Sequence, residues 1–287
     1  MILDGKTMAA DLRRETAEEA ARLTAHGHQP GLAVILAGEN PASVSYVKAK
    51  EKACKECGIR SFPVRLPATV SQEELLAEVR RLNEDPAVHG ILVQLPLPAG
   101  LDAQAVIRTI APEKDVDGFH PVSLGRLTIG LPTFLPCTPA GIVEMLRRAG
   151  VKTQGKHAVV VGRSNIVGKP VAQLLARKGV DCTVTVCHTA TEDLGAYTRQ
   201  ADILVVAAGA PNTVRAGMVK EGAIVIDVGV NRVPDPSRAK GYRLCGDVDF
   251  DAVEPSASLI TPVPGGVGPM TIAMLMRNTI QAAKGIS

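Results

Sequence analysis

The stretch His157-Ala-Val-Val-Val-Gly-Arg-Ser-Asn-Ile-Val-Gly-Lys-Pro170 decides the fold of the second half of this 287-residue chain. An apolar, β-branched run leads into a turn bracketed by Gly162 and Gly168 and then into helix-forming sequence, which predicts a strand, a tight turn and a helix. Unpaired backbone N–H groups and the positive dipole end at the start of such a helix favour an anion, and glycine lets the backbone approach it. Because Arg163 adds a cation, the stretch predicts a phosphate site.

The spacing of these glycines, Gly-x5-Gly, differs from the usual dinucleotide pattern Gly-x-Gly-x-x-Gly. The β-rich run 181–187 predicts a neighbouring strand, whose end normally meets the adenosine ribose. An NAD site would place an acid there, but the chain has Cys187, His188 and Thr189. A hydroxyl at Thr189 and a guanidinium at Arg163 suit a 2′-phosphate, so the sequence favours NADP over NAD. The alternative is an ordinary α/β turn with a solvated arginine.

Composition narrows the class of protein. The chain is 46% hydrophobic with a formal net charge of +3, so it can bury a core large enough for two domains. Basic and acidic residues are interspersed, and seven aromatic residues (four Phe, three Tyr, no Trp) offer few stacking surfaces, so we expect no nucleic-acid partner. No signal-like or membrane-spanning run is visible, which predicts a cytoplasmic protein with no membrane partner.

The six cysteines are scattered along the chain and suit a reducing compartment. Cys54 and Cys57 form the one close pair. No second pair of Cys or His follows at the spacing that a zinc site needs, so we expect no metal.

Helix-period stretches alternate with short apolar runs in the first half of the chain, which predicts a parallel α/β sheet. Asn40 and Pro41 supply a helix cap and first turn, and Gly58 ends that helix. The expected helices are 5–25, 41–57, 72–84 and 102–110, and the expected strands are 31–37, 59–66 and 89–94.

A stretch rich in proline and glycine, 114–139, interrupts the alternation and predicts the domain junction. A helix over 139–149 and strands at 157–162, 181–187, 202–207, 223–228 and 257–261 then predict a second sheet. The fold class is therefore α/β, with two α/β domains, the second a Rossmann-like doubly wound parallel sheet. We expect domains at 1–137 and 138–269, with a C-terminal helix, 270–287, that returns to the first domain.

Several polar residues of the first half fall where chemistry is expected. Ser43, Tyr46 and Lys50 share one face of the helix 41–57. Alone, this pattern also fits surface packing, because lysine stems commonly cover aromatic neighbours. Gln94 ends an apolar strand and would enter a cleft, or would only cap the strand as a solvated amide. Asp117, before a glycine, is a binding residue or part of a simple turn.

Six segments together resemble the bifunctional methylenetetrahydrofolate dehydrogenase/cyclohydrolase family, in that family's order and over essentially the whole chain. They are Tyr46-Val-x-x-Lys50, the run 90–98, Lys114-Asp-Val-Asp-Gly118, Pro136-Cys-Thr-Pro139, Gly162-Arg-Ser-x-x-Val-Gly-x-Pro170 and Pro262-Val-Pro-Gly-Gly-Val-Gly-Pro-Met-Thr271.

The resemblance implies two reactions in one cleft between the domains: NADP-dependent oxidation of 5,10-methylenetetrahydrofolate to the methenyl form, and hydrolysis of that product to 10-formyltetrahydrofolate. It implies that Lys50 exchanges protons or polarises water, with its pKa lowered by enclosure, and that Gln94 holds the geometry. Tyr46 would stack on the pterin, and Asp117 would accept from its amino and ring N–H groups. Ser43 matches the family serine near the lysine.

The resemblance also implies cofactor and loop contacts in the second domain. Cofactor contacts are expected at Gly162, Arg163, Ser164, Thr189 and the Val230 backbone, and a loop closing over folate at Pro264, Gly265 and Gly266, where the glycine pair could also be only a tight turn. One departure is that many members carry Ser at the place of Thr189, followed by a polar or basic residue at the place of Ala190. The hydroxyl survives, so NADP is kept as the expected cofactor.

Three alternatives compete with this interpretation. A monofunctional dehydrogenase would lack the lysine site, whereas Lys50 and Gln94 are both present. A shikimate- or amino-acid-type NADP dehydrogenase would leave Tyr46 and Asp117 without a pterin. A non-catalytic binding module would not need the proposed catalytic groups. The family resemblance further implies a homodimer and tetrahydrofolate derivatives as ligands.

Overall fold

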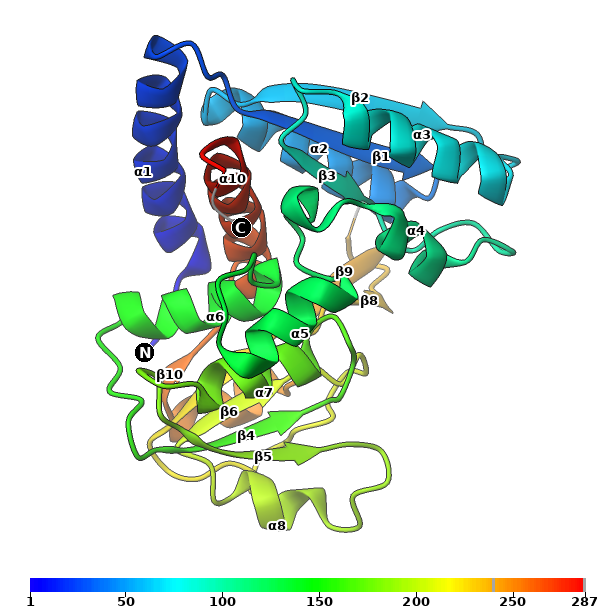
Figure 1. Ribbon diagram of the computed structural model, residues 1–287. Coiled ribbons are helices and arrows are strands. Elements are labelled where there is room, and N and C mark those ends of the chain that lie inside the picture. Colours follow the sequence, from blue (N-terminus) through cyan, green and yellow to red (C-terminus); the bar gives the residue numbers. More distant parts are fainter. Residues whose placement is uncertain (239–240, 286–287) are drawn as a thin grey trace. The chain divides into compact units, whose positions relative to one another are not determined.

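Two parallel sheets organise the computed structural model, which describes residues 1–238 and 241–285 (Figure 1). The chain forms two units. The three-stranded unit comprises residues 10–137 and 272–285, and the five-stranded unit comprises residues 1–9 and 138–271. This architecture confirms the predicted α/β class with two domains.

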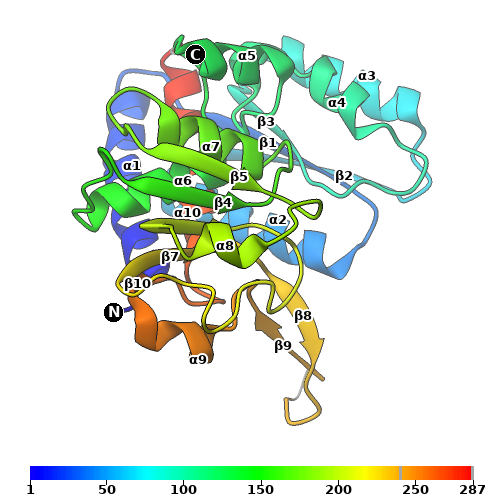
Figure 2. The ribbon, with the colours of Figure 1, turned by 90° about the horizontal axis from the view of Figure 1, so that it is seen from below.

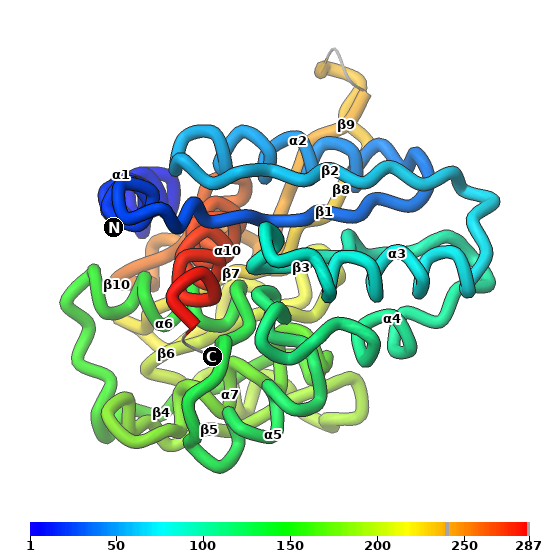
Figure 3. The backbone as a smooth tube through the Cα atoms, turned by 45° about the horizontal axis from the view of Figure 1, so that its top comes forward, coloured from blue at the N-terminus to red at the C-terminus, as the bar shows by residue number. Residues whose placement is uncertain are grey.

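In the three-stranded unit the strand order is β2-β1-β3, all parallel, with β1 central (Figure 3). The bounds are α1 Gly5–Ala25, β1 Gly31–Ala37, α2 Pro41–Glu56, β2 Arg60–Leu66, α3 Gln72–Glu84, β3 Gly90–Val93 and α4 Ala103–Thr109. A short 3₁₀ turn, Pro112–Lys114, precedes α5, Pro121–Ile129. The expected helices and strands of this half are confirmed to within one residue at each end.

Side chains of β1 alternate between the two faces of its sheet. Ala33 and Ile35 face a core built with Leu75 and Val79 of α3, Ile91 of β3 and neighbouring apolar groups of α4. Asn40 caps α2 as predicted, since its side chain accepts from Ala42 N at 2.9 Å and Ser43 N at 3.3 Å, with Pro41 at the first helical position. This fixes the start of the helix that carries Lys50.

Helix α5 lies inside the stretch in which the sequence indicated an interruption. Pro121 occupies its first turn, the His120 side chain accepts from Val122 N, and Gly130 ends it in the left-handed conformation. Proline and glycine, which usually interrupt a helix, therefore mark the start and the end of α5.

The five-stranded unit has the strand order β10-β7-β6-β4-β5, all parallel, which is a doubly wound arrangement. Its elements are α6 Cys137–Arg148, β4 His157–Val161, α7 Gly168–Ala176, β5 Thr183–Cys187, α8 Leu194–Thr198, β6 Ile203–Val206, β7 Ala223–Asp227, β8 Asn231–Pro234, β9 Tyr242–Cys245, α9 Phe250–Val253, a 3₁₀ turn Glu254–Ser256, β10 Ala257–Ile260 and α10 Val267–Ala283. Figure 2 shows the antiparallel hairpin β8–β9, which the sequence analysis missed, extending from this unit. Its two strands are four residues each and carry little apolar alternation.

Residues 1–9, expected in the first domain, pack with the five-stranded unit because Ile2 bridges to Ile260 and Leu3 N donates to Ile260 O at 2.8 Å. Helix α10 contributes 267–271 to the five-stranded unit and its remaining turns to the three-stranded unit. The last two residues of the helix expected over 270–287 lie outside the described residues. No helix in the described chain is long and apolar enough to cross a membrane.

Candidate active site

The turn between β4 and α7 has the strand–turn–helix form that its sequence predicts. Gly162 has φ +126, and a Cβ there would lie 2.2 Å from Ala207 O. A Cβ on Gly168 would lie 2.2 Å from Gly162 O. Both glycines are therefore required by close backbone packing, and residues 163–166 form an exposed turn in front of α7.

Ser164 organises this turn. Its Oγ accepts from Val167 N at 3.2 Å and Gly168 N at 3.3 Å, while Lys169 N donates to Ser164 O at 3.0 Å. The serine hydroxyl thus caps the first turn of α7, and the exposed Arg163 precedes it. In a doubly wound sheet of this order the ligand crevice opens between the strands corresponding to β4 and β6, where Gly162 meets Ala207.

Thr189 follows the adjacent strand, β5, at the same edge of the sheet. Gly162 N donates to Cys187 O at 2.8 Å, so the two strand ends lie side by side. The structure therefore brings Thr189, which is exposed, to the strand end beside Gly162 and Arg163. Thr191 is the hydroxyl that shapes the local turn, because its Oγ1 accepts from His188 N at 2.9 Å.

Two buried carboxylates of the same unit, Asp227 and Asp247, are not among the site residues that the sequence predicts. Asp227 accepts from Gly229 N at 2.9 Å, Asp247 N at 2.9 Å and Val248 N at 3.0 Å. Asp247 in turn accepts from the N–H groups of Ala208 and Gly209, both at 2.7 Å. Burial raises the pKa of Asp227 to about 6, although the backbone donors oppose the rise. The signal in the sequence was an aspartate adjoining a glycine-containing turn in both segments.

Val230 and the loop at Pro264 belong to the same unit. Val230 is 49% exposed, just beyond β7. Gly265 has φ +114, and a Cβ on Gly5 would lie 1.8 Å from Gly266 O. The glycine pair therefore forms a turn packed closely against the start of α1, with Pro264 exposed at its tip.

The three-stranded unit holds the predicted lysine site. Lys50 Nζ donates to Gln94 Oε1 at 2.9 Å. Gln94 Nε2 donates to Leu95 O at 2.5 Å, and its backbone N donates to Ile35 O at 2.9 Å. The amide is thus held from both ends, with its oxygen toward the lysine. It is a half-buried group in a defined network, not a solvated strand cap.

Burial lowers the pKa of Lys50 below its ordinary value, and the charge of nearby Asp117 partly opposes this change. For Asp117 itself, burial raises the pKa, and Lys50 partly offsets the rise. Gln94 carries no charge, so its bond to Lys50 lacks the coulombic stabilisation of the ammonium that a carboxylate would add. A proton is therefore easier to remove from Lys50 than from a solvated lysine.

The other two predicted residues of α2 differ in their surroundings. Ser43 is 2% exposed, and its Oγ has no hydrogen-bond partner among the described residues. Tyr46 is 45% exposed. The structure thus brings together Lys50, Gln94 and Asp117, and it leaves Tyr46 open at the surface of its unit.

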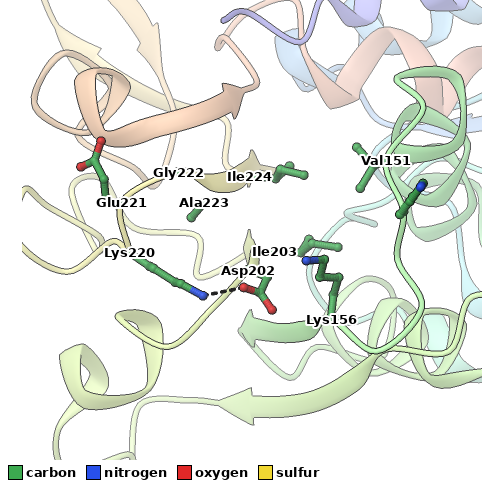
Figure 4. A pocket seen from close by; sticks show the side chains of 10 residues that line it. Val151, Lys156, Asp202, Ile203, Lys220, Glu221, Gly222, Ala223 and Ile224 are labelled. Carbon is green, nitrogen blue, oxygen red and sulfur yellow. Dashed lines mark hydrogen bonds and ion pairs between the residues drawn. The ribbon is translucent and has the colours of Figure 1, made fainter.

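A pocket of about 230 Å³ lies at the other edge of the five-stranded sheet, before the first residues of β4, β6 and β7 (Figure 4). Lys152, Lys156 and Lys220 line it, and Lys220 Nζ pairs with Asp202 Oδ1 at 2.6 Å. Because ligands of doubly wound sheets bind at the carboxyl ends of the strands, this pocket is separate from the predicted cofactor turn. Within the described residues no group of three His, Cys, Asp or Glu side chains could hold a metal ion.

Comparisons with known proteins cover nearly the whole chain. A family model described as tetrahydrofolate dehydrogenase/cyclohydrolase, catalytic domain, matches residues 3–117, and its NAD(P)-binding domain counterpart matches residues 136–287. The bifunctional protein FolD of Geobacillus thermodenitrificans is 59% identical over 283 residues, which are 99% of this chain and 97% of that protein.

Two solved structures are also similar. The bifunctional enzyme FolD, a methylenetetrahydrofolate dehydrogenase/cyclohydrolase from Campylobacter jejuni, has a TM-score of 0.94 and 51% identity, with 99% of this chain and 98% of that chain covered. The Trypanosoma brucei dehydrogenase-cyclohydrolase complexed with NADP cofactor and inhibitor has a TM-score of 0.94 and 48% identity, with 99% and 97% covered.

Proposed function

The chain belongs to the tetrahydrofolate dehydrogenase/cyclohydrolase family, and we propose that Lys50 and Gln94 perform its cyclohydrolase step while the turn at Gly162 holds NADP for its dehydrogenase step. It is a bifunctional enzyme of folate one-carbon metabolism. The family decides against a shikimate- or amino-acid-type dehydrogenase and against a non-catalytic module.

The observation that carries the assignment of Lys50 is the 2.9 Å bond from its Nζ to an amide oxygen that is itself held in place. A lysine works as a proton carrier near neutral pH only when its pKa is depressed, and burial lowers the pKa of Lys50. A carboxylate in place of Gln94 would raise the pKa of Lys50 again, because a negative charge in contact with the Lys50 ammonium stabilises it.

In the cyclohydrolase step, water adds to the methenyl carbon and loses one proton. The carbon–nitrogen bond of the bridge then breaks as the nitrogen gains a proton, and the remaining hydroxyl proton leaves to solvent as the formyl carbonyl forms. Lys50 in its neutral form would take the proton from the attacking water. As an ammonium it would return a proton to the departing nitrogen. Gln94 keeps the Lys50 Nζ in one place during both transfers.

For the dehydrogenase step, NADP would supply the hydride acceptor, and residues around Gly162 fit its phosphates. The close approach at Gly162 leaves room only for backbone, and an exposed turn precedes the start of α7, where the positive dipole end of the helix favours an anion. We assign Arg163 and Thr189 to the 2′-phosphate, Ser164 to the pyrophosphate turn and the Val230 backbone to the nicotinamide side. Their adjacency at one sheet edge supports this assignment.

We assign the folate to Asp117, Tyr46 and Ser43, with the loop at Pro264, Gly265 and Gly266 as a further contact. Asp117 suits a forked pair of N–H donors on the pterin. The exposed Tyr46 ring offers a stacking face. The buried Ser43 hydroxyl lacks a partner, and a ligand group or ordered water that paired with it would recover about 1–3 kcal/mol.

The test follows absorbance with purified protein, methylenetetrahydrofolate and either NADP or NAD, reading the reduced cofactor and the methenyl product separately. Formation of NADPH with little methenyl accumulation supports both activities and the proposed cofactor. NADPH with accumulating methenyl product contradicts the lysine assignment, and equal rates with NAD contradict the roles of Arg163 and Thr189.

We also propose a homodimer in a reducing, cytoplasmic compartment. Family membership supports the dimer, and the six cysteines of the described chain, all of them free thiols, suit a reducing compartment. Light scattering of the purified protein tests the dimer directly.

A further inference from the structure

We propose that Asn278 is a positioning residue that holds the Asp117 loop in its folate-binding conformation; this inference rests on the role proposed above for Asp117. Asn278 lies in α10, far from the loop in sequence, and is 2% exposed. Its Nδ2 donates to Val116 O at 2.8 Å and to Leu135 O at 3.0 Å. One amide nitrogen thus ties together the two segments that adjoin Asp117.

The two segments already touch through their backbones. Gly118 has φ +75, and a Cβ there would lie 2.6 Å from Pro136 N and 2.8 Å from Leu135 C. Cys137 Sγ donates to Val116 O at 3.3 Å. Asp117 therefore lies between two residues, Val116 and Gly118, whose backbones are both held against the segment 135–137.

The other side of the loop is anchored separately. The buried Asp115 carboxylate accepts from His120 N at 2.8 Å, from Phe119 N at 3.2 Å and from Ser123 Oγ at 2.7 Å. Asp115 thus secures the turn toward α5, and Asn278 secures it toward α10. With both anchors in place, the position of the Asp117 backbone is determined from two directions.

An amide is suited to this position because it supplies two N–H donors and no charge. Leucine has similar size but leaves the carbonyl groups of Val116 and Leu135 without this donor. A carboxylate would face two carbonyl oxygens with acceptors only and would add a negative charge near Lys50 and Asp117. The neutral amide fixes the loop without disturbing that charge pair.

A positioning role and a merely structural one differ in the kinetic constant they change. Loss of the clamp should displace Asp117 and weaken folate binding, whereas the Gly162 turn belongs to the other unit and keeps its own contacts. We therefore expect Asn278→Leu to raise KM for methylenetetrahydrofolate at least tenfold while KM for NADP changes less than twofold.

Asn83 offers a matched control in the same unit. Its Nδ2 donates to Thr109 O at 2.7 Å and its Oδ1 accepts from Ala111 N at 3.0 Å, so it also clamps two segments, away from Asp117. We expect Asn83→Leu and Asn278→Leu both to lower the thermal midpoint, but Asn83→Leu should leave both KM values within twofold. If both leucine variants raise the folate KM equally, the effect is general loosening and the proposal is overturned.

Asp117→Ala is measured beside them so that the two proposals can fail separately. A raised folate KM in Asp117→Ala with an unchanged one in Asn278→Leu overturns the role of Asn278 alone. An unchanged folate KM in Asp117→Ala removes the proposed role of Asp117 and the inference with it. Where Asn278→Leu does not fold, Asn278→Ser, which keeps one shorter donor, is measured instead under the same criteria.

Discussion

Lys50 Nζ lies 2.9 Å from Gln94 Oε1, and Gln94 Nε2 donates to Leu95 O. The second hydrogen bond fixes the orientation of the amide, so its neutral oxygen stays directed toward Lys50. The pair joins the middle of α2 to the end of β3. Because neither partner of this bond is a carboxylate, the depressed pKa of Lys50 survives the contact.

Gln94→Glu changes this contact from neutral to charged with little change of shape. The new carboxylate raises the pKa of Lys50, so the cyclohydrolase rate near neutral pH should fall at least tenfold and its pH profile should move upward. The dehydrogenase rate should change much less. The rate of methenyltetrahydrofolate hydrolysis, measured at a series of pH values, gives the shift of the pH profile.

Gln104→Glu is the matched control, because Gln104 is exposed in the same unit. It should leave both activities and the pH profile unchanged. A Gln94→Glu enzyme with an unshifted cyclohydrolase profile would show that Gln94 does not set the protonation of Lys50.

Gly162→Ala tests the cofactor turn. The added Cβ would meet Ala207 O at 2.2 Å, in a backbone conformation that alanine rarely adopts. We expect a loss of about 1–3 kcal/mol in the free energy of unfolding and a rise of at least tenfold in the Kd for NADP. Calorimetry and cofactor titration measure the two effects.

Gly125→Ala supplies the contrasting glycine, since it lies within α5 and a Cβ there meets nothing within 4 Å. It should stabilise the protein by about 0.5–1 kcal/mol and leave NADP binding unaltered. Equal NADP affinity in the two alanine variants would rule out the Gly162 turn as the cofactor site.

Arg163→Ala tests cofactor choice. A charge-assisted bond to a 2′-phosphate contributes about 1.5–3 kcal/mol, so its removal should weaken NADP binding roughly tenfold to a hundredfold. Binding of NAD, which lacks that phosphate, should be nearly unaffected. Parallel titrations with the two cofactors give the ratio, and an equal loss for both would mean that Arg163 contacts a phosphate they share.

The raised pKa of Asp115 predicts that the free energy of unfolding depends on pH. Burial raises its pKa from an ordinary value of 3.8 to about 6, so the folded state holds its proton more tightly than the unfolded state does. The stabilisation from this proton is present below about pH 4 and is lost as pH rises through about 6. Summed over that window the loss is on the order of 3 kcal/mol.

Asp115→Asn removes this titration, so denaturant unfolding of the variant and the unmodified chain, measured from pH 4 to 7, should give curves that are not parallel. Carboxyls with lowered pKa values, such as Asp202, act in the opposite direction and are common to both proteins. The difference between the two curves therefore isolates Asp115, and parallel curves would exclude its raised pKa.

Much of the fold follows from local sequence. The apolar run of β1 and the capping residue Asn40 predict their elements because the determining contacts lie within a few residues. Helix α5 lies in the stretch 114–139, whose proline and glycine content predicts an interruption, whereas Pro121 and Gly130 form the two ends of the helix.

Part of the candidate site also follows from local sequence, and part does not. The helix face and the strand end predict Lys50 and Gln94 as separate candidates, and the family resemblance implies that they act together. An aspartate beside a glycine-containing turn marks both Asp227 and Asp247 in the sequence, but their pairing, like the clamp at Asn278, depends on segments that meet only after folding. Buried polar networks of this kind are visible only when the tertiary contacts are known.

The measurement that tests the central claim most directly is the fate of the methenyl product in Lys50→Met. The variant removes the amine while keeping an unbranched apolar stem, so dehydrogenation should continue and methenyltetrahydrofolate should accumulate alongside NADPH. Separate addition of methenyltetrahydrofolate should show hydration nearly abolished. Hydration at the rate of the unmodified chain would remove Lys50 from the mechanism.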